Sequence, residues 1–205
     1  MIDLSTKFKC GKVEDINRAR KIILNLKASN CRIFFPKLDI SSLQFLIYTD
    51  ASFANISNGT GSVGGQIIFL KDKKGNVSAL DWHAGKIKRV VRSTLAAETL
   101  SLVEGLESGI YHRILLSELT GKKPEKFEIR AIIDNKSCVQ ALRSTSQVED
   151  KRLRIEIGEI KELIQNKPFQ EVTWVAGSAQ IADVLTKAGA SGLKLLDILQ
   201  NGQFF

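Results

Sequence analysis

An apolar run at residues 43–50, with the sequence LQFLIYTD, dominates the hydrophobic pattern of the chain. Residues 45–48 are consecutive aromatic and branched side chains, which is typical of a strand buried on both faces near the centre of a sheet. A polar stretch follows, so the pattern predicts that the strand stops at Asp50. Ligands collect at the carboxyl ends of strands in open α/β sheets, which makes Asp50 a candidate site residue, although a turn aspartate is the simpler interpretation of a single acid.

The spacing of apolar residues predicts the remaining elements: alternation indicates strands, and recurrence every three or four residues indicates helices. The motif DKKGN at 72–76 predicts a hairpin turn that makes the first three strands a meander. Alternating or continuous apolar residues predict strands at 62–70, 77–82, 127–134 and 171–176, and helical spacing predicts helices at 13–29, 93–119, 137–142, 151–166 and 177–187.

The strand predicted at 127–134 repeats the pattern of the first strand and ends in Asp134. A strand, a long helix and a further strand form a crossover unit, so this strand should lie parallel to the Asp50 strand and beside it. The order of elements predicts an α/β fold with a mixed five-stranded sheet flanked by helices. Asp50 and Asp134 should then meet at one edge of the sheet.

Two more acids have positions that suggest a site. Glu98 lies between Leu95 and Leu102 on the apolar stripe of the long helix, where an ionised carboxylate is costly without a partner. Either Glu98 pairs with a nearby cation such as Arg92, or it coordinates a metal ion, and the helix alone does not decide between the two. Asp183 lies in the predicted terminal helix.

Composition and charge narrow the class of protein. With 43% hydrophobic and 25% charged residues among 205, the chain should form a soluble globular core. The net charge of +8 and the clustering of Lys and Arg suit a polyanion such as nucleic acid, though each cluster alone is more often a solvated face. The cluster just before the long helix is the best candidate for backbone phosphate contacts, and its members are Lys86, Lys88, Arg89 and Arg92.

Several classes are disfavoured. Cys10, Cys31 and Cys138 are odd in number and form no CxxC pair, so neither a disulfide framework nor a zinc site is indicated. There is no secretory leader pattern and no apolar run of membrane-spanning length, and nucleotide-binding GxGxxG or GxxxxGK loops are absent from the sequence. We therefore expect a reduced, intracellular protein that does not associate with membranes.

Four carboxylates that converge would repel one another unless cations neutralised them. Hard oxygen ligands of this kind suit Mg²⁺ or Mn²⁺ rather than zinc. Two such ions roughly 3.5–4 Å apart can activate a water molecule, orient a phosphodiester and stabilise the leaving oxygen. The acids therefore predict hydrolysis by phosphoryl transfer.

Four motifs resemble a known family in their order and spacing: YTDAS at 48–52, RSTLAAET at 92–99, IDNKS at 133–137 and QIADVLTK at 180–187. They resemble the ribonuclease H domain at the C-terminal end of copia-type retrotransposon polyproteins. The resemblance implies a ribonuclease H-like domain over 43–190, preceded by an N-terminal helical extension at 1–42 that resembles the end of the reverse transcriptase region, and followed by a C-terminal tail at 191–205.

The resemblance also implies roles and partners. Asp50 would bridge two Mg²⁺ ions, for which Mn²⁺ could substitute; Glu98 and Asp134 would share the ion that activates water, and Asp183 would complete the shell of the second. The implied substrate is the RNA strand of an RNA–DNA hybrid, and the implied partner is the polymerase region of the same element. The implied location is the cytoplasm, a virus-like particle or the nucleus.

The sequence is compatible with two other interpretations. Integrases of the same fold order their acids Asp, Asp, Glu, whereas Glu98 comes second here, which argues against an integrase. A catalytically silent nucleic-acid-binding remnant of a retroelement is the alternative to an enzyme. Retention of all four acids favours the enzyme, because decay strikes positions at random.

Overall fold

A mixed sheet of five strands forms the centre of the computed structural model, which describes residues 11–29, 32–56, 61–146, 148–165 and 169–204. The strands lie in the order β3 (Val77–Lys86), β2 (Gly61–Lys71), β1 (Gln44–Ile56), β4 (Glu128–Ile133) and β5 (Phe169–Trp174). β1 pairs antiparallel with β2, which pairs antiparallel with β3, while β1–β4 and β4–β5 are parallel. The mixed sheet and the parallel pairing of the two acid-bearing strands are confirmed.

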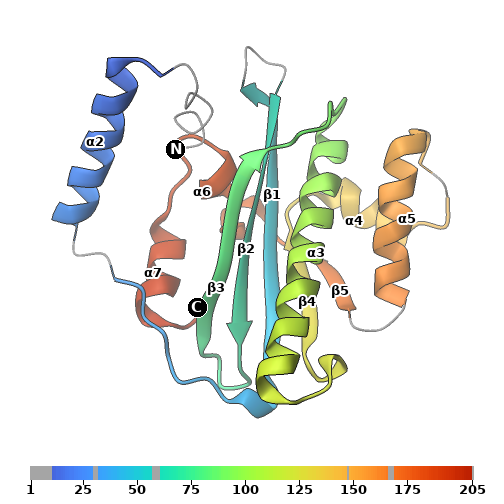
Figure 1. The fold of residues 1–205 in the computed structure, drawn as a ribbon. Helices are drawn as coiled ribbons and strands as arrows, with labels where there is room; N and C mark the ends of the chain where they lie inside the picture. The colour runs from blue at the N-terminus through green and yellow to red at the C-terminus, as the bar shows by residue number, and fades with distance from the viewer. Residues whose placement is uncertain (1–10, 30–31, 57–60, 147, 166–168, 205) are drawn as a thin grey trace.

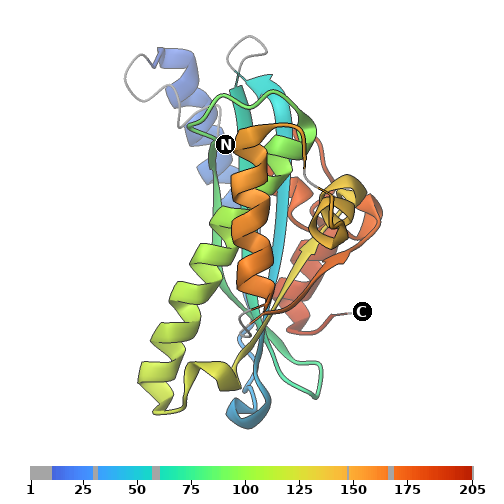
Figure 2. The ribbon, with the colours of Figure 1, turned by 90° about the vertical axis from the view of Figure 1, so that its right-hand side faces the viewer.

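Helices cover both faces of the sheet, as Figure 1 shows. One face carries α3 (Thr94–Thr120), α4 (Lys136–Arg143) and α5 (Lys151–Gln165), and Figure 2 shows α3 and α5 running along it. The other face carries α6 (Asp183–Thr186) and α7 (Leu193–Asn201). Short 3₁₀ turns lie at Ile40–Ser42, Pro124–Lys126 and Gly177–Ala179.

The apolar core is divided by the sheet because successive residues of β1 point to opposite faces. Phe45 and Ile47 pack with Leu102 and Leu106 of α3, while Leu46 packs in the cluster that contains α7. The long helix begins after Ser93, whose hydroxyl accepts a hydrogen bond from the amide of Ala96, and ends at Gly121 in the left-handed conformation. These local signals explain why the sequence defined α3 closely.

The predicted end of the first strand at Asp50 is wrong. β1 continues to Ile56, because β2 continues to supply backbone partners: Asp50 lies opposite Gly65 and Ser52 opposite Val63. The parallel pairing with β4 stops earlier, with Tyr48 opposite Ile132. Asp50 therefore lies just past the end of the parallel pair, within a longer antiparallel strand.

The single terminal helix predicted at 177–187 is also wrong. The segment forms a 3₁₀ turn, an extended residue at Gln180 and then the short α6. The buried side-chain amide of Gln180 donates through Nε2 to the carbonyl oxygen of Thr49 at 2.9 Å, and its Oε1 accepts from the backbone N–H of Ala182. This tertiary anchor holds Gln180 out of the helical conformation.

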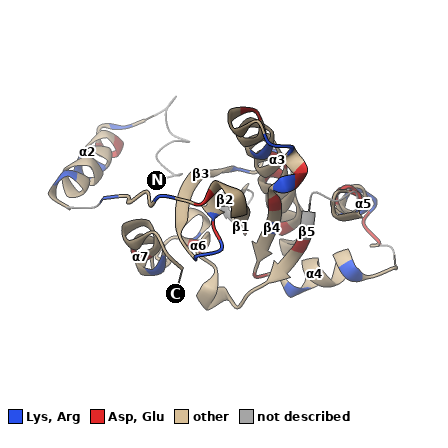
Figure 3. Ribbon diagram, turned by 90° about the horizontal axis from the view of Figure 1, so that it is seen from below, with Lys and Arg blue, Asp and Glu red and all other residues tan. Residues whose placement is uncertain are grey.

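The ends of the chain differ in how they pack. α2 (Val13–Ala28) has no buried residue and stands apart from the sheet, beyond α7 (Figures 1 and 3). The segment predicted as a C-terminal tail contains α7, and Phe204 lies with its ring centroid 5.5 Å from that of Phe69. The division into residues 1–42, 43–190 and 191–205 stays a prediction.

Other predictions are tested only in part. Cys138 is a free, buried thiol, whereas Cys10, Cys31 and the predicted helix end at Asn166 lie outside the described residues. Within the described ranges, none of the helices combines the length and the apolar character that a membrane crossing requires.

Candidate metal centre

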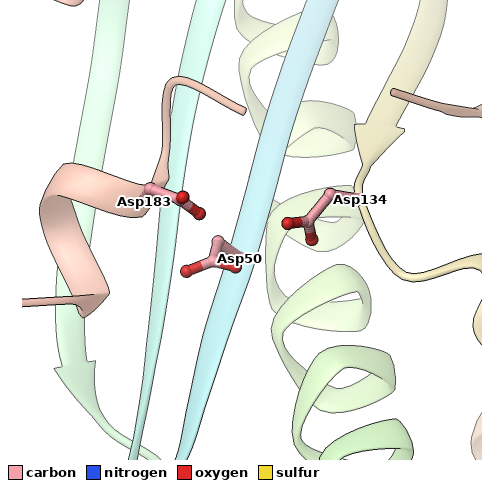
Figure 4. Close-up of side chains that lie close together, drawn as sticks. All are labelled: Asp50, Asp134 and Asp183. Carbon is pink, nitrogen blue, oxygen red and sulfur yellow. The ribbon is translucent and has the colours of Figure 1, made fainter. Parts of the chain in front are cut away.

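Three aspartates from distant parts of the sequence come together at one end of the β1–β4 pair. Asp50 lies on β1, Asp134 directly follows β4, and Asp183 is the first residue of α6. One carboxylate oxygen from each lies within 4.8 Å of the other two, and Figure 4 shows the three side chains directed toward one another. The group could therefore hold a metal ion.

The position of Asp183 depends on close packing of α6 against the sheet. A Cβ atom at Gly65 would lie 2.8 Å from both Leu185 Cβ and Thr186 Cγ2, so only glycine permits this approach. The hydroxyl of Ser52 donates to the carbonyl oxygen of Thr186 at 3.0 Å, which joins β1 to the end of α6. These contacts place Asp183 beside Asp50.

Gly65→Ala is expected to destabilise the fold by about 1–3 kcal/mol, because a methyl group would overpack the contact between β2 and α6. It should also weaken metal binding by displacing Asp183. Gly158→Ala on α5 is the matched control, since a Cβ there meets nothing within 4 Å and should be neutral or mildly stabilising. Urea unfolding of both variants measures the difference, and equal stabilities would contradict the packing argument.

The loop after β4 is fixed by its neighbours. The indole N–H of Trp174 donates to the carbonyl oxygen of Asp134 at 2.9 Å, and the side chain of Asn135 caps α4 by accepting from the amide of Cys138. Asp134 is thereby held at the junction between a strand end and a helix start.

Glu98 lies beside the three aspartates but outside the group whose oxygens approach within 4.8 Å. Its side chain is on the sheet-facing side of α3 and is only 4% exposed. Burial, followed by the negative charges of Asp50 and Asp134, raises the Glu98 pKa to about 9. Its Oε2 atom has no hydrogen-bond partner among the described residues. Arg92, which the sequence offered as an ion-pair partner for Glu98, is exposed.

Two aspartates also have perturbed acidity. Asp50 is fully buried, and burial raises its pKa to about 6 although the Thr186 hydroxyl and the Lys187 ammonium both act to lower it. Burial likewise raises the pKa of Asp134. Ionising several of these acids together is therefore costly unless a cation joins them.

The sequence argument missed Thr186 and Lys187. The hydroxyl of Thr186 donates to one oxygen of Asp50, and the Lys187 ammonium lies 3.1 Å from the other. The same ammonium is 2.8 Å from an oxygen of Asp183. The spacing of four between Asp183 and Lys187 in QIADVLTK was the available signal, since such pairs face each other on a helix.

The donor set suits a hard divalent cation. All the acids offer oxygen ligands, as Mg²⁺ and Mn²⁺ prefer, and none of the group is His or Cys. The buried Glu98 Oε2 without a partner is the kind of atom that a cation would satisfy. Asp50, Asp134 and Asp183 would hold the ion, with Glu98 at its side.

The four predicted phosphate-binding residues lie together on the surface. Lys86 ends β3, while Lys88, Arg89 and Arg92 lie on the exposed connection to α3. Arg89 forms an ion pair with Glu156 of α5.

A groove of about 620 Å³ runs between this connection and the start of α5, and its basic lining residues are Arg89, Arg92, Lys151 and Arg152. Among the described residues, Lys and Arg are spread over several elements (Figure 3), so the contact with nucleic acid stays a prediction.

Comparisons with known proteins give structural likeness only. No protein-family model matches the chain, and no curated protein matches it. An LC11 ribonuclease H1 isolated from compost by a metagenomic approach is 18% identical, with a TM-score of 0.49 over 70% of this chain and 92% of that one. Ribonuclease H1 from the archaeon Halobacterium salinarum is 17% identical, with a TM-score of 0.44 over 70% and 94%.

A viral protein is also similar. The protease-reverse transcriptase of prototype foamy virus is 11% identical, with a TM-score of 0.44 over 83% of this chain and 22% of that one. At such identities and TM-scores the likeness carries nothing about activity. The chain has the mixed five-stranded sheet flanked by helices that its sequence predicts.

Proposed function

We propose that the chain is a metal-dependent endonuclease that hydrolyses the RNA strand of RNA–DNA hybrids. The convergence of Asp50, Asp134 and Asp183 beside the buried Glu98 carries this proposal. The motif resemblance supports a source in a copia-type retroelement, with the polymerase region of the same element as partner. A cytoplasmic or particle-associated location, or a nuclear one, belongs to the same proposal.

The site residues have distinct parts in this chemistry. Bound Mg²⁺ or Mn²⁺, as a pair of ions, would activate a water molecule and stabilise the leaving oxygen. Asp50 is fully buried and oriented by Thr186, so it provides a fixed ligand. The Asp134 and Asp183 side chains are 17% and 23% exposed, which leaves the side of the site that they form accessible to a phosphodiester.

Specificity for a hybrid would come from the RNA strand and from the duplex backbone. A protein distinguishes RNA from DNA at a given position through the ribose 2′-hydroxyl. Lys86, Lys88, Arg89 and Arg92 lie on the β3–α3 connection, just before the helix that carries Glu98, and would contact backbone phosphates. One similar protein, LC11 ribonuclease H1, was itself solved in complex with an RNA/DNA hybrid.

Cleavage of an end-labelled RNA–DNA hybrid by the full chain tests the proposal, with Mg²⁺ and Mn²⁺ supplied separately. We expect cuts in the RNA strand alone, none in a DNA duplex of the same sequence, and loss of cutting in Asp134→Asn. Hybrid binding without cleavage by folded protein under either ion would instead favour the catalytically silent remnant. Full cleavage by Asp134→Asn would show that the site is wrong.

The basic connection gives a separate prediction about binding. Removing two phosphate contacts with Lys88→Ala and Arg92→Ala together should weaken hybrid binding and lower its salt dependence by about 2 in log–log slope. Fluorescence anisotropy across a series of salt concentrations measures both quantities. The control is Lys21→Ala with Arg20→Ala on α2, which removes the same charge from a helix remote from the site. Equal slopes for the two double variants would contradict phosphate contacts by the connection.

A further inference from the structure

Lys187 supplies a positive charge to the aspartates from within the chain. Its Nζ atom lies 2.8 Å from Asp183 Oδ1, 3.1 Å from Asp50 Oδ1 and 3.9 Å from Asp134 Oδ2. These are the three residues whose oxygens approach closely enough to share a metal ion. The ammonium therefore lies among the carboxylate oxygens that would coordinate a metal ion.

A divalent ion and this ammonium exclude one another. Mg²⁺ bonds to carboxylate oxygens at about 2.0–2.1 Å, so an ion held by the same oxygens would come close to Nζ. Two like charges at such a separation in a partly buried site repel strongly. The Asp50 and Asp183 oxygens that accept from the ammonium are among those that would coordinate the metal ion, so the two cations compete for the same negative charge.

The lysine is the group that is able to move. Asp50 is fully buried on the central strand, and its second oxygen is engaged by the Thr186 hydroxyl. The Lys187 side chain is 40% exposed and sits just beyond the end of α6, with a flexible stem that lets the ammonium turn to solvent. Displacement of the lysine thus leaves the aspartates in place.

We propose that Lys187 is a built-in competitor of the divalent cation, a positioning residue whose ammonium holds the three aspartates together and must leave them when the cation binds. This rests on the proposed function, since it concerns the same metal centre. Lys187 then sets how much cation the protein needs. Without its charge, the aspartates bind the cation more tightly but repel one another more when no cation is present.

Mn²⁺ binding to the full chain tests the competition without using activity. The free ion is followed by electron paramagnetic resonance and the heat by calorimetry, at one pH and ionic strength. We expect Lys187→Met to bind Mn²⁺ about tenfold more tightly than the unchanged protein, and Lys187→Arg to stay close to it because the positive charge remains. Lys21→Met, which removes one exposed charge from α2, is the control for net charge and should leave affinity unchanged.

Thermal unfolding supplies the second readout. With chelator present, Lys187→Met should melt below the unchanged protein, and excess Mn²⁺ should raise its Tm by more. Lys187→Gln removes the charge but keeps a polar tip, and it takes the place of Lys187→Met if circular dichroism shows that the methionine variant is unfolded.

Mn²⁺ affinity in the neutral variants that is equal to or weaker than that of the unchanged protein would overturn the competition, as would the absence of binding by every form. Hybrid cleavage by the same samples separates the two proposals. Tighter Mn²⁺ binding by Lys187→Met together with an intact hybrid in all samples would support the competition and count against the nuclease.

Discussion

Asp50→Asn is expected to lower metal-dependent cleavage of the hybrid by at least about 10²-fold, the scale at which loss of one preorganised charge is felt in an active site. Asp50 is the only one of the three clustered aspartates that is fully buried, and it accepts hydrogen bonds at both oxygens. Asparagine has the same shape but offers one oxygen and no charge. Metal ligation should therefore fail while the packing around the side chain is kept.

Stability separates this explanation from simple unfolding. Burial already raises the Asp50 pKa to about 6, so the protein pays to ionise this acid at neutral pH and asparagine should not destabilise the metal-free fold. Single-turnover cleavage with saturating Mn²⁺ gives the rate, and thermal unfolding in chelator gives the stability. Asp197→Asn, on α7 and outside the aspartate group, is the matched control: Asp197 is half-buried, and asparagine keeps the oxygen that accepts from the Asn201 side chain, so both quantities should stay unchanged. Cleavage retained by Asp50→Asn would remove Asp50 from the site.

The parts of the site that the sequence predicted are those that follow from neighbouring strands. The run at residues 45–48 marked a central strand, and the long helix before β4 made a parallel neighbour of β1 the expected arrangement. Asp50 and Asp134 therefore had to meet. The burial of Glu98 followed from its place on the apolar stripe of α3.

The remaining parts depend on contacts that no local pattern records. The break before Asp183 comes from Gln180, whose side chain bonds to the backbone of Thr49 on another element. The approach of α6 depends on the missing side chain of Gly65, which in sequence is only one glycine of a strand. Lys187 was visible four residues after Asp183, but that spacing equally describes an ordinary helical ion pair.

Glu98→Gln is expected to stabilise the protein in chelator at pH 8, by on the order of 2–4 kcal/mol. The Glu98 pKa is raised from 4.5 to about 9, first by burial and then by the charges of Asp50 and Asp134. A folded-state pKa above the unfolded one means that folding takes up a proton. The contribution of Glu98 to stability is full below about pH 4.5 and is lost as the pH rises toward 9.

Urea unfolding at pH 4.5 and pH 8 measures this directly. Glutamine resembles the neutral acid at both values, so the advantage of Glu98→Gln should be present at pH 8 and vanish at pH 4.5. Glu104→Gln, an exposed acid on the same helix, is the control and should show no such dependence. An advantage of equal size at both pH values would mean that proton uptake by Glu98 is not its source.

Excess Mn²⁺ should reverse the order of stability for the same pair of proteins. A cation beside Glu98 favours the ionised form, so the unchanged protein gains stability from Mn²⁺ that Glu98→Gln lacks, and cleavage should fall in the variant. A residue kept only for packing would give the same ranking with and without Mn²⁺. A ranking that changes sign would mean that burying an acid on α3, which costs stability at neutral pH, is offset by the cation that it helps to bind.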